Sequence, residues 1–134
     1  MSAEQGTGAT IQPKDPLARF IFSSGHFSRE KQRVKHNAFM PAADGKTSVF
    51  RTKGLKEEET WPIGEEVAEK RKQKLHARGD IVAADVSKVK LRVVPTETPP
   101  CHANIEDWPA EKSAQILVAI DLADAAKLFL KPGI

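Results

Sequence analysis

The sequence contains a single cysteine, Cys101, among its 134 residues. One thiol excludes an intramolecular disulfide and suits a reducing compartment. No stretch is apolar enough to cross a bilayer, because the most apolar one, residues 114–130, is interrupted by a glutamine, two aspartates and a lysine. Residues 1–16 also lack the apolar centre of a signal peptide. These absences predict a cytoplasmic protein that does not enter the membrane.

The sequence also lacks the short motifs that hold common cofactors and metals. It has no phosphate-binding glycine loop, no dinucleotide-binding fingerprint, no HExxH, no paired CxxC and no EF-hand loop. Its acidic residues do not have the spacing of a metal-dependent nuclease. We therefore expect neither a metal ion nor a bound cofactor.

The composition that remains is that of one globular domain. Hydrophobic residues make up 40% of the chain and charged residues 29%, which are ordinary values for a folded protein. A chain of this length buries a hydrophobic core without disulfides or metals to support it. Residues 1–15 are mostly small and polar, so they predict a flexible N-terminal leader. Residues 16–134 predict a single compact α+β domain.

Strand patterns occur in five segments: 17–22, 33–40, 46–52, 89–95 and a short edge strand at 102–105. The dipeptide Asp44-Gly45 is a strong tight-turn signal between the second and third of these segments. We therefore expect a β-hairpin there, within a basic segment that covers residues 29–53. Arg78-Gly79-Asp80 predicts another turn. The domain is expected to contain an antiparallel sheet of four to five strands packed against two helices.

Two segments have helical patterns. Residues 56–75 begin with acids and end with bases, which complements the helix dipole, and Pro62 and Gly64 predict a kink or two shorter helices. Residues 109–130 predict the second helix. Apolar residues on this helix occupy more than one side, because Ile116, Leu117 and Ile120 fall outside the main apolar face. The helix is therefore either deeply buried or the contact surface of a homodimer.

Basic residues are concentrated in one part of a chain whose formal net charge is only +3. Within residues 29–53, two acids face seven basic residues: Arg29, Lys31, Arg33, Lys35, Lys46, Arg51 and Lys53. Interleaved phenylalanines at positions 27, 39 and 50 add stacking surfaces for bases. This pattern predicts a small binding module that engages nucleic acid or an acidic partner surface. A solvated face that pairs with the acids Glu57 to Glu59 is the other interpretation.

A second functional hypothesis is a small phosphate-directed enzyme. His26 and His102 would serve as acid and base, and Ser28 and Arg29 would hold the anion. The tripeptide His26-Phe27-Ser28 resembles one half of the signature of two-histidine phosphoesterases, while the second His-x-x tripeptide ends in Asn104 instead of a hydroxyl residue. The hypothesis requires that the strand containing Phe20 pairs with the strand containing Ile105, because adjacent strands would bring the two histidines together.

Overall fold

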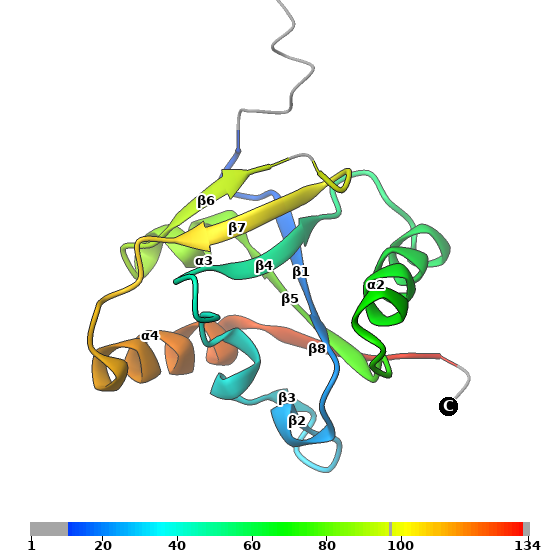
Figure 1. Cartoon of the computed structure of the whole chain (residues 1–134), viewed down its shortest axis with the longest axis horizontal. Helices are drawn as coiled ribbons and strands as arrows, with labels where there is room; N and C mark the ends of the chain where they lie inside the picture. Colours follow the sequence, from blue (N-terminus) through cyan, green and yellow to red (C-terminus); the bar gives the residue numbers. More distant parts are fainter. Residues whose placement is uncertain (1–10, 97, 133–134) are drawn as a thin grey trace, which may run out of the picture.

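The computed structural model of the chain describes residues 11–96 and 98–132 (Figure 1). The strands over these residues are β1 (Pro16–Ile21), β2 (Phe27–Ser28), β3 (Arg33–Val34), β4 (Thr47–Arg51), β5 (Ala77–Val82), β6 (Arg92–Pro95), β7 (His102–Glu106) and β8 (Lys127–Leu130). The helices are α2 (Glu57–Arg71), α3 (Ala83–Lys88) and α4 (Lys112–Ala125), with two short 3-10 helices, η1 (Ser24–His26) and η2 (His36–Phe39).

One antiparallel sheet organises the molecule. Its strand order is β6-β7-β4-β1-β5-β8, and all neighbouring strands run in opposite directions. β2 and β3 form a separate two-stranded ribbon, seen at the bottom of Figure 1. The predicted fold class, an α+β domain with an antiparallel sheet and packed helices, is confirmed. The sheet has six strands instead of four or five, and α3 is a third, short helix.

The helices cover both faces of this sheet. Successive residues of a strand point to opposite faces, and β1 contributes to a core on each side. Leu17 and Ile21 are buried with apolar residues of α3 and α4, whereas Ala18 and Phe20 are buried with apolar residues of α2. The sheet is therefore the central layer, and each of its faces has its own hydrophobic core.

The β-hairpin predicted within residues 29–53 does not form. β3 pairs with β2, and the residues after it turn into η2 instead of continuing as a strand to position 40. The other predicted partner, β4, lies between β1 and β7 in the sheet, so both of its edges are already occupied. The turn signal at Asp44-Gly45 is correct, since Gly45 has a φ of +80°.

Side chains explain why a 3-10 helix replaces the predicted strand. Arg19 Nε donates to the Ala38 carbonyl at 2.6 Å, and Thr47 Oγ1 donates to the Phe39 carbonyl at 2.9 Å. These hydrogen bonds satisfy two backbone acceptors that a strand would have paired with a neighbouring strand. Ala38 and Phe39 are also fully buried, so this short helix packs into the core next to α4.

The helix predicted over residues 109–130 is shorter than expected. α4 ends at Ala125, and residues 127–130 form β8 along the free edge of β5, with Lys127 opposite Asp80. This pairing gives hydrogen-bond partners to the outer edge of β5, whose backbone groups a longer helix would have left unpaired. β7 is likewise not an edge strand, because β6 covers its outer side. None of the helices over the described residues is long and apolar enough to cross a membrane.

α2 is one continuous helix, so the predicted division into two shorter helices is wrong, and a kink near Pro62 stays a prediction. Its buried residues, Thr60, Trp61, Gly64 and Ala68, follow one stripe that packs on the sheet. Pro62 removes only one backbone N–H from the helical ladder. The N-terminal turn is stabilised by Glu59, whose Oε1 accepts from the backbone N–H of the cap residue at 2.8 Å. Packing of the stripe therefore outweighs the local effect of the proline.

A buried arginine joins α2 to the sheet. Arg78 is 3% exposed and lies near the start of β5, not in the turn predicted for Arg78-Gly79-Asp80. Its two terminal nitrogens donate to the two carboxylate oxygens of Glu57 at 3.0 and 2.6 Å, and its Nε donates to Asp80 at 3.0 Å. The guanidinium also lies 4.7 Å from the ring centre of Trp61 and 4.5 Å from that of Phe129.

These partners keep Arg78 charged in a buried position. Burial by itself lowers the pKa of Arg78, but the hydrogen bonds to Glu57 and Asp80 outweigh burial and the pKa is raised. The hydrogen bond from Arg78 in turn holds the pKa of Glu57 below its ordinary value. One side chain thus connects the first turn of α2, the strand β5 and the terminal strand β8.

The beginning of the described chain packs on the domain. Within the predicted leader, residues 1–10 lie outside the described residues, and residues 11–15 are held by hydrogen bonds. The N–H of Gln12 donates to Asp15 Oδ2 at 2.9 Å, and the N–H groups of Ala83 and Ala84, at the start of α3, donate to the carbonyls of residues 15 and 13. Residues 12–15 therefore contact the rest of the domain, and the flexible leader over residues 1–15 stays a prediction.

We expect Gly64→Ala to destabilise the protein, although alanine normally stabilises a helix interior by about 1 kcal/mol relative to glycine. A Cβ at position 64 would lie 2.5 Å from Phe20 Cδ1 and 2.9 Å from Leu75 Cδ2, and both side chains are buried. Such overpacking costs roughly 1–3 kcal/mol. Urea unfolding measures the difference, and Phe20→Leu added to Gly64→Ala should recover part of the loss. A rise in stability for Gly64→Ala alone would contradict the packing described.

We also expect Arg78→Met to lower the free energy of unfolding by about 3 kcal/mol, the low end for a broken buried ion pair. The low end applies because Glu57 keeps 62% of its side chain exposed and remains solvated. Arg33→Met is the matched control, since the Arg33–Asp124 pair is exposed on both sides and should cost less than about 0.5 kcal/mol. Equal losses for the two variants would show that Arg78 has no special role.

Candidate functional site

Part of the predicted basic segment gathers around one surface hollow. The hollow has a volume of about 350 Å³ and is lined by Ser28, Lys31, Arg33, Lys35, His36, Asn37, Ile120, Ala123 and Asp124. We call it the basic hollow. Its charged lining residues are three bases, Lys31, Arg33 and Lys35, and one acid, Asp124. The β2–β3 ribbon and the start of η2 form one wall, and the C-terminal half of α4 forms the other.

The local backbone explains how these basic residues come together. Val34 is fully buried, while Arg33 and Lys35 on either side of it are exposed, as alternation along an extended segment requires. Ser28 Oγ accepts from the N–H of Lys31 at 3.1 Å and closes the turn between β2 and β3. Arg33 donates to Asp124 of α4 at 3.1 Å, in a pair with both side chains more than half exposed.

The remaining residues of the predicted nucleic-acid surface lie elsewhere. Arg29 is exposed in the β2–β3 turn and is not among the residues that line the basic hollow. Lys46 is exposed beside the Asp44-Gly45 turn, and Arg51 is half-buried at the end of β4. Lys53 lies 3.6 Å from the buried carboxylate of Asp15. The predicted surface is thus divided.

The phenylalanines expected to stack on bases are inside the protein. Phe27, Phe39 and Phe50 are 6%, 0% and 4% exposed. They belong to the two hydrophobic cores on either side of the sheet. The basic hollow therefore presents charges and hydrogen-bonding groups but no aromatic surface from these residues.

A second hollow lies between α2 and the ends of β4 and β7, and we call it the α2–β7 pocket. Its volume is about 400 Å³. The apolar residues that line it are Phe50, Leu55, Ile63, Val67, Pro99 and Pro100. The polar residues that line it are Ser48, Glu66, Lys70, Arg71, Cys101 and His102. An apolar wall with a few convergent polar groups is the usual composition of a small-molecule site.

His102 is fixed from both sides of its ring at one end of this pocket. Its Nε2 lies 2.7 Å from Ser48 Oγ, and its Nδ1 lies 2.6 Å from Thr96 Oγ1. The ring also contacts Phe50 edge-on, with 5.2 Å between ring centres. Either tautomer of the imidazole fits these contacts, because each hydroxyl both donates and accepts. The sequence pattern did not single out Ser48 or Thr96.

Two arginines, Arg19 and Arg71, lie near this end of the pocket. Arg19 extends beyond the point where β1 and β4 stop pairing, and its terminal nitrogen donates to the Ser48 carbonyl at 2.8 Å. Burial, with a smaller effect from the charge of Arg71, lowers the pKa of Arg19 to about 10, so it stays charged at neutral pH. Burial, followed by the charge of Arg71, also lowers the pKa of His102, which favours the neutral imidazole.

The structure does not bring the two predicted catalytic histidines into one site. β4 lies between β1 and β7, so the expected pairing of the Phe20 and Ile105 strands is wrong. His26 is in η1, beyond the end of β1, and its ring is not among the residues that line the α2–β7 pocket. Burial and the charge of Arg19 lower its pKa. Ser28 and Arg29 remain with the β2–β3 ribbon, apart from His102.

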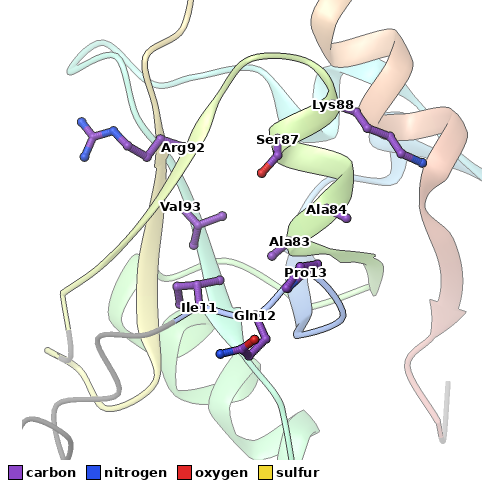
Figure 2. A pocket seen from close by; sticks show the side chains of 9 residues that line it. All are labelled: Ile11, Gln12, Pro13, Ala83, Ala84, Ser87, Lys88, Arg92 and Val93. Carbon is purple, nitrogen blue, oxygen red and sulfur yellow. The ribbon is translucent and has the colours of Figure 1, made fainter.

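A third hollow lies between residues 11–13, α3 and β6 and has a volume of about 570 Å³. Figure 2 shows the charged ends of Lys88 and Arg92 pointing away from the space between them. Arg92 is also engaged by Asp107, at 3.0 Å from its Nε. With no charged groups converging on it, this hollow is a weaker candidate. The described residues contain no cluster of histidine, cysteine and acidic side chains that could hold a metal ion.

α4 leaves two large apolar side chains in water. Leu117 is 67% exposed and Ile120 is 38% exposed, and Ile120 lies at the edge of the basic hollow. The more deeply buried residues of this helix are Ala119, Leu122 and Ala123. The predicted homodimer through helix 109–130 would bury the exposed pair, and it remains a prediction.

The shifted histidines make stability depend on pH. A histidine whose folded pKa lies below its unfolded value of about 6.5 binds its proton more readily in the unfolded chain. Stability is therefore unaffected above that value and falls as the pH drops through it. We expect urea unfolding at about pH 7.5 and 5.5 to show this loss, and His102→Gln and His26→Gln each to reduce it. An unchanged pH dependence in the His102→Gln variant would contradict the burial of its ring.

Comparisons with protein-family models, with curated proteins and with solved structures found no match. The assignment of function therefore depends on which hollow has the geometry and the charge to hold a ligand of definite chemistry.

Proposed function

We propose that this protein is a small binding module that engages the phosphate backbone of nucleic acid through the basic hollow. The observation that supports the proposal is the convergence of Lys31, Arg33 and Lys35 on one concave surface beside Ser28. Cationic side chains that neutralise phosphates release condensed counterions, which is the main source of sequence-independent affinity. We place this activity in the cytoplasm.

The polar neighbours of these cations suit a phosphate. Ser28 and Asn37 line the same hollow and add hydrogen-bonding side chains to its charged rim. The one acid, Asp124, is held by Arg33 in an exposed pair, and such pairs contribute little to stability. A phosphate can therefore replace Asp124 as the partner of Arg33 at little cost in stability. Lys31, Arg33 and Lys35 are then all available to contact phosphates.

The buried phenylalanines define the kind of nucleic acid recognition. Phe27, Phe39 and Phe50 are unavailable for base stacking. Recognition would then use the backbone and depend weakly on base sequence, with affinity that decreases steeply as salt increases. An acidic protein surface is the other partner class that the charges fit, and the experiment below distinguishes it.

The phosphate-directed enzyme has less support as an alternative. This hypothesis requires His26, His102 and Arg29 in one site. The sheet order separates the two strands whose pairing would bring the histidines together. His102 instead contacts Ser48 and Thr96, in a pocket that does not include Arg29. We retain nucleic acid binding as the better supported function.

The test measures binding of a labelled duplex and of its single strand by fluorescence anisotropy at low and moderate salt. We expect binding at low salt, with a slope of log K against log[salt] of roughly −2 to −3 for about three phosphate contacts. Charge reversal of Lys31 and Lys35 to glutamate should weaken binding at least about tenfold and flatten this slope.

The matched control reverses two other exposed lysines, Lys74→Glu with Lys112→Glu, which keeps the same net charge on the variant. If net charge alone were responsible, the two double variants would bind equally weakly, and the basic hollow would have no special role. Failure of the unmodified protein to bind either oligonucleotide at low salt, with binding to polyglutamate instead, would replace nucleic acid by an acidic partner.

A further inference from the structure

The α2–β7 pocket is not used by the proposed nucleic acid contact. It faces α2, whereas the basic hollow lies beside α4. Its dimensions fall in the usual range for sites that enclose small organic molecules. Its lining combines three features that belong together in a ligand site: an apolar wall, a small net positive charge and a rigid polar end.

The apolar wall comes from both sides of the pocket. Phe50 projects from β4 and is itself 4% exposed, while Ile63 and Val67 are half-buried on α2, one turn apart. Pro99 and Pro100 add to this lining, and prolines lose little backbone freedom when a ligand binds because their ring already fixes φ. This wall suits an apolar chain or ring and offers no hydrogen bonds along its length.

The charged residues of the pocket carry a net charge of +1. Lys70 and Arg71 supply two positive charges, and Glu66, 3.9 Å from Lys70, removes one. Arg71 lies with its guanidinium 5.1 Å from the ring centre of Phe22, so the ring holds it at the pocket wall. The lining is complementary to a ligand with a single negative charge.

The polar end can receive the head group of such a ligand. In the tautomer with the proton on Nε2, His102 donates to Ser48 Oγ, and the hydroxyl hydrogen of Ser48 is then free to donate to a ligand. Thr96 accommodates this tautomer by donating to Nδ1. Arg19 fixes the backbone of Ser48 through its carbonyl. A carboxylate placed between Ser48 and Arg71 would accept from both.

We propose that the α2–β7 pocket binds a small monocarboxylate with an apolar body. The carboxylate lies between the Ser48 hydroxyl and the Arg71 guanidinium, and the apolar body lies along Phe50, Ile63 and Val67. Planar, two-pronged donation by arginine matches a carboxylate better than it matches a neutral head group. Binding selects the Nε2–H tautomer of His102.

The test uses octanoate, acetate and octanol as probes, with binding followed in amide NMR spectra of the full chain. We expect octanoate to bind saturably and to shift the amide signals of Ser48, Val67 and His102. Acetate has the head group without the body, and octanol has the body without the charge, so each should bind at least about tenfold more weakly. The ring ¹⁵N shifts of His102 should move toward the Nε2–H tautomer when octanoate is added.

Variants separate the proposal from nonspecific binding. Arg71→Gln and Ser48→Ala should each weaken octanoate at least about tenfold, the usual effect of losing a hydrogen bond to a charged group. Lys74→Gln removes the same charge outside the pocket lining and should change nothing. Equal affinity for octanol, equal affinity for acetate, or unchanged octanoate binding by Arg71→Gln would each overturn the proposal. None of these outcomes bears on nucleic acid binding at the basic hollow.

Discussion

The buried guanidinium of Arg78 is the contact on which the architecture depends most. It lies in β5, donates two hydrogen bonds to Glu57 of α2, and packs against Phe129 of the last strand. A charge in this position is tolerated only because carboxylates occupy all three of its donor nitrogens. The same contact anchors the first turn of α2 on the sheet. The wall of the α2–β7 pocket is therefore positioned by an interaction on the far side of that helix.

A sheet covered on both faces divides the surface into regions of different chemistry. On the α2 side, the helix leaves a hollow with an apolar wall and a net charge of +1 beside His102. On the α4 side, the β2–β3 ribbon and the helix leave a hollow with three basic side chains. The same β4 strand contributes Phe50 and Ser48 to the first region and Val49 to the core of the second side. Strand alternation is the physical reason why one short segment serves both.

Arg19 fills the place where β1 and β4 separate, next to the residues of the α2–β7 pocket. The two strands pair at only two positions, and Arg19 then donates to carbonyls of η2 and of β4. The guanidinium replaces the backbone donors that a longer pairing would have supplied. Its positive charge also contributes to the lowered pKa of His26, whereas the charge of Arg71 contributes to the lowered pKa of His102, and burial is the larger cause for each.

The sequence by itself determined the α+β class, the existence of β1, β4 and α2, the turn at Asp44-Gly45 and the local excess of basic residues. These are properties of neighbouring residues: alternation, helical spacing, turn chemistry and charge density. Only the tertiary structure decided that β4 pairs with β1 and β7, that residues 127–130 form a strand, and that His102 meets Ser48 instead of His26. Strand partners are chosen by which edges and faces become buried together, and that choice depends on segments distant in the sequence.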